Sequence, residues 1–260
     1  MDEIIHVKNT SYSRYEELLM RRDNLKKEAF QWDREYIRVF GDKILKVFEI
    51  KLECIRKKKT ISFCQAIANH GRTVDQDELQ KYLQEEMAEY QAQLDAMVEN
   101  NEAAKDTHEI SQIDILEIKK IYRKLAKQLH PDINPKTSEI EELQDLWERI
   151  SIAYKCNKLK DMQELEILAT AALKSLGDGK LEIEIPNIDI KIAEVEAEIE
   201  NIRNTDPYMY KFILEDKEAV EEKNAALDEE YDSYDEYGKQ LDEILQALMA
   251  NGVTFTWRMN

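Results

Sequence analysis

The fold is decided by residues 118–154, which read IKKIYRKLAKQLHPDINPKTSEIEELQDLWERISIAY. Apolar residues recur every three or four positions in the first part of this stretch, and that spacing predicts one face of a helix. These residues are Ile118, Tyr122, Leu125 and Leu129. The second part repeats the pattern and predicts a second helix. Its apolar stripe consists of Ile140, Leu143, Trp147, Ile150 and Tyr154.

Two prolines separate the predicted helices. Pro131 lacks a backbone N–H and clashes with the preceding turn, so the first helix ends before it. Pro135 resists helix in the same way and biases Asn134 toward an extended conformation. A short loop between two amphipathic helices predicts an antiparallel hairpin whose stripes face each other. The outer face of the first helix carries Lys119, Lys120, Arg123, Lys124 and Lys127.

Three segments of this hairpin resemble a known domain. The runs Ile118-Lys119-Lys120, Tyr122-Arg123-Lys124-Leu125-Ala126 and His130-Pro131-Asp132-Ile133-Asn134-Pro135 are similar to helix II and the loop of a J domain. Trp147-Glu148-Arg149-Ile150, followed by Ala153-Tyr154, resembles its helix III. The resemblance implies a co-chaperone, because J-domain proteins dock on DnaK-type heat-shock ATPases and accelerate their ATP hydrolysis.

The chain departs from the family pattern on both sides of the hairpin. No Tyr-x-x-Leu-Gly segment precedes the first helix, and no Arg-Arg-x-x-Tyr-Asp segment follows the second. The sequence also contains no Gly/Phe-rich linker and no CxxCxGxG zinc motifs. The chain therefore resembles divergent members that carry the J-domain hairpin on an unrelated body, and its client protein is unknown.

The resemblance also implies which residues would contact a DnaK-type ATPase. Asp132 would pair with a basic residue of the ATPase, while His130 and Pro131 would fix the loop. A charge-assisted pair of this kind is costly to leave half made at an interface. We expect the loop to be exposed. The assigned residues are Lys119, Tyr122, Arg123, Lys124, Lys127, His130, Pro131, Asp132 and Asn134.

Composition favours an all-α fold with long helices. Charged residues make up 35% of the 260, whereas Gly and Pro number only six and four. The net charge of −18 disfavours non-specific binding to nucleic acid or to an anionic membrane. Residues 113–136 oppose this trend, with six Lys or Arg against three Asp or Glu. Such a patch indicates either an acidic protein surface as partner or a solvated helix face.

The sequence predicts a cytoplasmic protein without a membrane segment. Cys54, Cys64 and Cys156 are widely spaced and odd in number, which is typical of reduced thiols rather than of disulfides or a zinc site. The N-terminal residues lack the basic and apolar regions of a secretory signal. No stretch approaches the roughly 18 apolar residues that a membrane span needs.

The sequence contains no recognisable catalytic motif. It shows no Gly-rich phosphate loop, no HExxH and no GxSxG, so we expect no cofactor, no metal and no enzymatic activity. His130 beside Asp132 could suggest a general base. An exposed loop, however, provides no pocket to exclude water or to shift a pKa.

Residues 11–105 are predicted to form a long antiparallel hairpin with coiled-coil spacing. Its first helix is capped by Ser11 or Ser13, and its apolar seam contains one polar position, Arg22. The heptad phase slips near Gly41. The second helix is capped by Asp75 and follows a short connection, so the two helices must be antiparallel.

Residues 109–176 hold the J-like helices, and residues 181–260 are predicted as an acidic helical hairpin. In the latter, a helix from about residue 189 is followed by one that Asp206 caps and that runs to Ala250. Residues 181–185 and 253–257 alternate apolar and polar side chains, which predicts two strands in a minor antiparallel ribbon.

Matching helix lengths leaves two apolar stripes without partners, Tyr15–Val39 and Leu227–Leu248. Soluble monomers avoid exposing apolar patches of this size. We therefore predict that the two stripes bury each other, within one chain or across a homodimer.

Two functional classes remain open. One is a J-domain co-chaperone with coiled-coil arms that bind a client or another partner. The alternative is a coiled-coil scaffold whose J-like hairpin is only structural. A third class, nucleic-acid binding through the basic helix, is disfavoured by the net charge.

Overall fold

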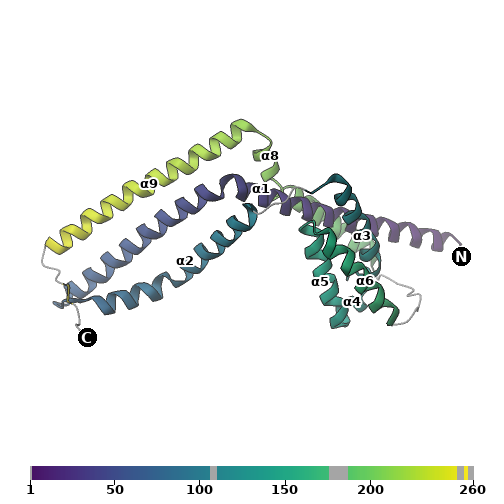
Figure 1. Cartoon of the computed structure of the whole chain (residues 1–260), viewed down its shortest axis with the longest axis horizontal. Coiled ribbons are helices and arrows are strands. Elements are labelled where there is room, and N and C mark those ends of the chain that lie inside the picture. The colour runs from purple at the N-terminus through teal and green to yellow at the C-terminus, as the bar shows by residue number, and fades with distance from the viewer. Residues whose placement is uncertain (1, 106–109, 176–186, 251–254, 257–260) are drawn as a thin grey trace. The chain divides into compact units, whose positions relative to one another are not determined.

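The computed structural model describes residues 2–105, 110–175, 187–250 and 255–256, with the side chains of the first helix described from Ser11 onward. These residues form helices and two short strands (Figure 1), so the predicted all-α class is confirmed. The long helices are α1 (Asp2–Asn69), α2 (Gln76–Lys105), α3 (Gln112–Leu129), α5 (Glu141–Lys155), α6 (Leu159–Ser175), α7 (Ile188–Arg203) and α9 (Lys217–Ala250). The short elements are α4 (Lys136–Glu139), α8 (Tyr210–Leu214), β1 (Val74–Asp75) and β2 (Phe255–Thr256).

The chain divides into two compact units. Unit 1 comprises residues 1–33 and 108–211, and unit 2 comprises residues 34–107 and 212–260. Helix α1 contributes its first half to unit 1 and its second half to unit 2. Helices α7 and α9, which the sequence suggested as a single C-terminal hairpin, belong to different units.

In unit 2, α1 and α2 form the predicted antiparallel hairpin. Lys59 pairs with Glu86 at one end, and Asp42 pairs with Lys105 at the other. The predicted cap is also confirmed, because Asp75 Oδ1 accepts the backbone N–H groups of Asp77 and Glu78. Helix α1 itself begins at Asp2, earlier than the predicted caps at Ser11 and Ser13.

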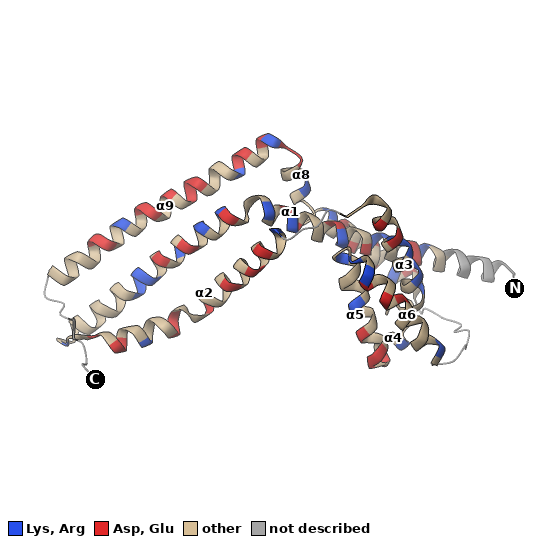
Figure 2. Ribbon diagram, viewed as in Figure 1, with Lys and Arg blue, Asp and Glu red and all other residues tan. Residues whose placement is uncertain are grey.

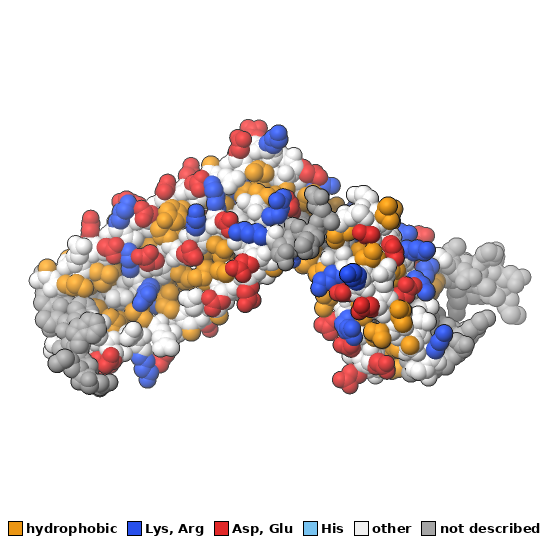
Figure 3. All heavy atoms as spheres, in the orientation of Figure 1, with side chains coloured by type: hydrophobic (Ala, Val, Ile, Leu, Met, Phe, Trp, Pro, Cys, Tyr) orange, Lys and Arg blue, Asp and Glu red, His pale blue; other side chains and the backbone are white. Residues whose placement is uncertain are grey.

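Helix α9 lies along α1 and runs parallel to it (Figure 1). Lys43 pairs with Asp228 and Lys57 with Asp242, so contacts advance together along both helices. Acidic residues predominate along α9 (Figure 2), and two of them meet these lysines of α1. On the visible face of unit 2, hydrophobic side chains lie between rows of charged ones (Figure 3).

The two apolar stripes that were predicted to bury each other, Tyr15–Val39 and Leu227–Leu248, do not pair with each other. The α9 stripe is buried against a later part of α1, where Leu227 packs with Phe40 and Val47, and Leu241 packs with Cys54 and Ile61. The earlier α1 stripe is covered in unit 1 by α7. The reason is that a break separates α7 from α9, so each covers its own half of α1 within one chain.

That break also corrects the predicted start of the last helix. Helix α9 begins at Lys217 rather than at Pro207, and the short α8 precedes it. Asp216, not Asp206, is its cap, since Asp216 Oδ1 accepts the N–H groups of Glu218 and Ala219.

One half of the predicted ribbon, residues 181–185, lies outside the described residues. Of the other half, Phe255–Thr256 pairs in parallel with Val74–Asp75. The parallel course of α9 leads toward the α1–α2 turn, where β1 lies (Figure 1).

In unit 1, α3, α5 and α6 enclose one core. Helix α6 begins at Leu159 and packs against both α3 and α5. The fully buried side chains of this core include Ile118, Leu125, Leu129, Leu143, Ile150 and Met162. Each such side chain contributes about 1.5–3 kcal/mol by leaving water, so this three-helix core holds the loop between α3 and α5.

Candidate functional site

The His-Pro-Asp loop begins where α3 ends. Ser111 caps the other end of α3 by accepting the Asp114 N–H, and the apolar stripe then runs to Leu129. His130 is the C-cap; its N–H donates to the Ala126 carbonyl, 2.9 Å away, while its backbone is already extended. Pro131 therefore follows a completed helix end, as the sequence predicted.

The loop is held by hydrogen bonds of its own. The His130 carbonyl accepts the N–H groups of Ile133 and Asn134 at 2.9 and 2.7 Å. The Asn134 amide nitrogen donates to the Gln128 carbonyl, and its oxygen accepts the Lys136 N–H. Asn134 is buried, so its side chain ties the loop to α3 and α4 rather than facing a partner.

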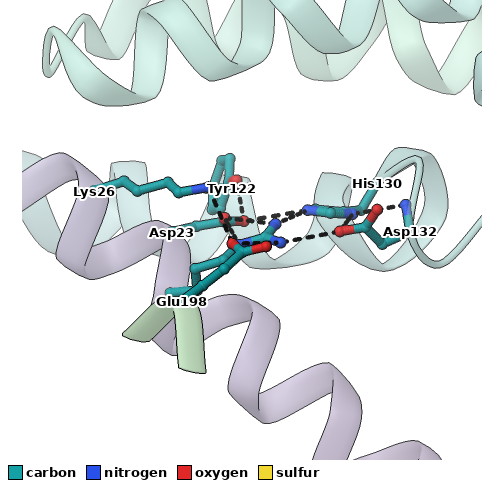
Figure 4. Close-up of polar contacts among 7 residues, drawn as sticks. Asp23, Lys26, Tyr122, His130, Asp132 and Glu198 are labelled. Carbon is teal, nitrogen blue, oxygen red and sulfur yellow. Dashed lines mark hydrogen bonds and ion pairs between the residues drawn. The ribbon is translucent and has the colours of Figure 1, made fainter. Parts of the chain in front are cut away.

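Two adjacent residues of α1 contact the loop (Figure 4). Arg22 Nη1 donates to Asp132 Oδ2 at 3.1 Å, and the same guanidinium donates twice to Asp23 Oδ1 at 3.1 Å. Glu198 of α7 lies 3.5 Å from Arg22 and from Lys26. The sequence identified Arg22 only as the polar position of an apolar seam, and it gave no signal for Asp23 or Glu198.

The His130 imidazole is fixed between the loop and α1. Its Nδ1 accepts the Asp132 N–H at 3.0 Å, and its Nε2 lies 3.0 Å from Arg22 Nη2. Asp23 Oδ2 lies 3.4 Å from this Nε2 and accepts the Tyr122 hydroxyl at 2.8 Å. His130 is 3% exposed, so its ring is a buried part of the packing.

The Asp23 carboxylate is held in its charged form. Burial by itself would raise its pKa. The hydrogen bond from His130, the charges of His130 and Arg22, and the hydrogen bond from Tyr122 outweigh burial and hold the pKa of Asp23 below its usual range. The charged Asp23 carboxylate therefore lies beside the His-Pro-Asp loop.

The expectation of an exposed loop is wrong. His130, Ile133 and Asn134 are buried, and the Asp132 side chain retains 40% of its exposure. Ile133 packs in an apolar cluster with residues of α1 and α7 rather than with the α3–α5–α6 core. The cluster consists of Tyr15, Leu19, Leu25, Ile133, Ile192, Val195 and Ile199. The loop is therefore buried because Ile133 makes apolar contacts with α1 and α7 and because Asp132 pairs with Arg22.

The aromatic residues of the hairpin form a stack under α1. Tyr122 is buried and stacks on Tyr154 with ring centroids 3.8 Å apart. Trp147 is partly buried and packs against the core that contains Leu125 and Leu129. Its ring meets the His130 ring edge at 4.8 Å, so it supports the loop from the α5 side.

The basic residues of α3 fall into different environments. Arg123, Lys124 and Lys127 are exposed, whereas Lys119 is partly buried. Lys127 pairs with Glu16 of α1 at 2.6 Å, and Lys124 pairs with Glu166 of α6 at 2.9 Å. The structure thus brings His130, Asp132 and Lys127 beside α1, with Lys124 on the α6 side.

The helical hairpin, its buried core and the His-Pro-Asp turn agree with one family. Residues 106–164 match the family model of the DnaJ domain. The chain carries a DnaJ domain. The match extends beyond the resemblance seen in the sequence, because it includes the start of α6. At the family level, proteins with a DnaJ domain are co-chaperones. Comparisons with curated proteins and with solved structures found no match.

Other kinds of site find little support in the described part of the chain. None of its helices is both long and apolar enough to cross a membrane. Within the same residues, no group of three or more His, Cys, Asp or Glu side chains is arranged to hold a metal ion. The DnaJ domain and its loop therefore remain the leading candidate site.

Proposed function

We propose that the DnaJ domain docks on a DnaK-type heat-shock ATPase and stimulates its ATP hydrolysis. The observation that carries this proposal is the His-Pro-Asp turn at the end of a basic helix, inside a segment that matches the DnaJ family. Asp132 keeps 40% of its side-chain exposure, so its carboxylate can be reached from solvent. It is the residue that pairs with a basic group of the ATPase.

The exposed cations of α3 supply the second part of the docking surface. Arg123, Lys124 and Lys127 lie on the same helix that leads into the loop. Their charges steer association with an acidic surface, and this contribution weakens as salt rises. The carboxylate of Asp132 then fixes the register, because a charge-assisted hydrogen bond is directional.

Single-turnover ATP hydrolysis by a DnaK-type ATPase tests this function. The full chain is expected to accelerate hydrolysis, and Asp132→Asn is expected to abolish the acceleration. Asp145→Asn is the matched control, since Asp145 is exposed on α5 and pairs with Arg149 one turn further along the same helix. The control should stimulate like the wild type.

Two outcomes would count against docking through the loop. Stimulation that survives in Asp132→Asn removes Asp132 from the interface. A wild-type chain that fails to stimulate several DnaK-type ATPases, even at saturating concentration, leaves the DnaJ domain without this activity.

A structural role for the hairpin is the second candidate function. The burial of His130 and Ile133 under α1 favours it, because both side chains take part in packing within unit 1. In that case the chain is a scaffold that binds a partner through its long helices. Asp132→Asn would then lower the free energy of unfolding by about 1 kcal/mol while leaving no ATPase activity to lose.

The remaining expectations of the sequence stay proposals. The client is an unidentified protein, and coiled-coil packing of the long helices would provide its binding surface. A homodimer is testable by sedimentation, although α7 and α9 already cover α1 within one chain. The three cysteines are free, which supports a cytoplasmic location. We propose no cofactor, nucleic-acid or membrane partner, and no enzymatic activity of the chain itself.

A further inference from the structure

We propose that residues 15–25 of α1 act as an intramolecular cover that closes the His-Pro-Asp loop and must leave it before the DnaJ domain docks. The inference rests on the proposed function and adds a regulation of the same site. Below, these residues are called the loop cover.

The polar half of the loop cover reproduces what a docking partner would offer. Arg22 presents a guanidinium to Asp132 at 3.1 Å, which is the pairing proposed for a basic residue of the ATPase. Only 10% of the Arg22 side chain is exposed. A second cation that approaches Asp132 Oδ2 therefore competes with Arg22 for the same carboxylate.

The acidic residues of α1 meet the cations and donors of α3. Glu16 pairs with Lys127 at 2.6 Å, and Asp23 accepts the Tyr122 hydroxyl at 2.8 Å. These contacts run in opposite directions along the two helices, so α1 lies antiparallel along α3. It offers α3 negative groups and offers the loop a positive one, as an acidic partner with a basic contact would.

The apolar half of the loop cover explains why the loop is closed rather than only paired. Ile133 is fully buried in a cluster with Tyr15, Leu19 and Leu25 of α1. Burial of one such side chain is worth about 1.5–3 kcal/mol. Opening the loop exposes this cluster, so docking competes with both the ion pair and the apolar contact.

The competing interpretation is that Arg22 positions Asp132 for docking. The two interpretations predict opposite effects of the same substitution. If Arg22 closes the loop, its removal increases docking; if Arg22 positions Asp132, its removal weakens docking. The ATPase shifts the closed–open equilibrium of the loop only through its different affinity for the two states. The change in docking affinity on removing Arg22 therefore reports whether Arg22 favours the closed or the open state.

The test compares Arg22→Gln with Arg14→Gln in the full chain. Arg14 is the matched control, because it lies on the same helix and its ion pair among the described residues is with Glu196 of α7, at 2.6 Å, rather than with the loop. We expect Arg22→Gln to lower the concentration for half-maximal ATPase stimulation about 5- to 10-fold, the usual size of such coupling. Arg14→Gln should leave it unchanged.

A second variant, Glu16→Gln, tests the loop cover in case Arg22→Gln fails to fold. Glu16→Gln removes only the contact of the loop cover with Lys127, whose side chain is 59% exposed. It should shift half-maximal stimulation in the same direction by less than Arg22→Gln. Arg22→Gln combined with Asp132→Asn should not stimulate at all.

Hydrogen exchange separates failure of the loop cover from failure of the proposed function. Without any ATPase, Arg22→Gln should speed exchange of the Ile133 and Asn134 amides about 10-fold, and Arg14→Gln should not. Faster exchange without stimulation by any variant would support the closed loop and reject the ATPase as its partner. Unchanged exchange overturns the loop cover. Where the wild type does stimulate, a concentration for half-maximal stimulation that Arg22→Gln leaves unchanged or raises also overturns it.

Discussion

Charged residues on the first half of α1 differ in how completely they are paired. Arg22 meets three carboxylates, those of Asp23, Asp132 and Glu198. Lys27, about one turn further along, is also buried, yet its Nζ has no hydrogen-bond partner among the described residues. It lies over the Tyr154 ring, 3.9 Å from the centroid. The ring offsets part of the cost of burying the ammonium.

Replacing Lys27 by Met should stabilise the protein. Burial, reinforced by the charge of Lys119, lowers the pKa of Lys27 to about 8. The folded state therefore binds this proton less tightly than the unfolded state, where the pKa is 10.5. The resulting destabilisation is fully present below pH 8 and disappears as pH rises toward 10.5. At pH 7 we expect Lys27→Met to raise the free energy of unfolding by about 1–2 kcal/mol.

Urea unfolding near pH 7 and near pH 10 checks both the sign and the pH window. The advantage of Lys27→Met should shrink at the higher pH. Lys26→Met is the control, because Lys26 is 45% exposed and pairs with Glu198; it should change stability by less than about 1 kcal/mol. A Lys27→Met protein less stable than the wild type at pH 7 would show that Lys27 makes a favourable contact.

At the scale of helices, the sequence predicted those elements whose periodicity is strong. The stripe from Ile118 to Leu129 and the proline after it defined α3 and its end, because no alternative structure buries that pattern. Helix pairing was harder to predict. The α9 stripe could match any long apolar face, and the sequence did not show that α9 begins only after Asp216.

The candidate site was predicted only in part for a similar reason. The loop residues were recognisable because they are contiguous in the sequence. Arg22 and Asp23 lie about 100 residues earlier in the chain, and the sequence alone gave no reason to place them beside Asp132. Tyr122 was assigned to a docking face, yet the same helical phase also places it under α1.

The heptad phase slip predicted near Gly41 coincides with a close contact between α1 and α2. The phase slip at Gly41 falls where α2 ends, and a Cβ there would overlap Asn101 Oδ1 of α2. Asn101 is buried and donates to Asp42 at 2.8 Å. The glycine therefore permits close approach of the two helices.

We expect Gly41→Ala to destabilise the protein by about 1–3 kcal/mol, because it overpacks this contact. In an Asn101→Ala background the same substitution should stabilise by up to about 1 kcal/mol, since alanine favours helix over glycine. Gly238→Ala on α9 is the control. Its Cβ would meet Cys54 at an ordinary 3.5 Å, so it should stabilise in the wild type. Thermal unfolding of the wild type, Gly41→Ala, Asn101→Ala, the double variant and Gly238→Ala decides, and a neutral Gly41→Ala in the wild type contradicts the packing argument.

At the scale of the whole molecule, both units depend on the C-terminal third of the chain. Helix α7 covers Tyr15 and Leu19 in unit 1, and α9 covers Phe40 and Val47 in unit 2. Removing residues 179–260 uncovers both stripes of α1, and exposed apolar patches of this size cause association. We expect the truncated chain to aggregate or to lose helical signal in circular dichroism.

A shorter truncation after Ala250 is the control for this experiment. It retains α7 and α9, so the chain should stay helical and elute from size-exclusion chromatography without aggregates. A chain truncated at residue 179 that stays monomeric and fully helical would show that α1 does not need these covers.

The most direct test of the central claim is hydrogen exchange of the full chain with and without a saturating ATP-bound DnaK-type ATPase. Docking at the His-Pro-Asp loop requires the loop cover to leave it. We expect exchange to accelerate in residues 15–25 of α1 while residues 120–130 of α3 become protected. Unchanged or slower exchange in residues 15–25, together with no new protection on α3, would contradict the account.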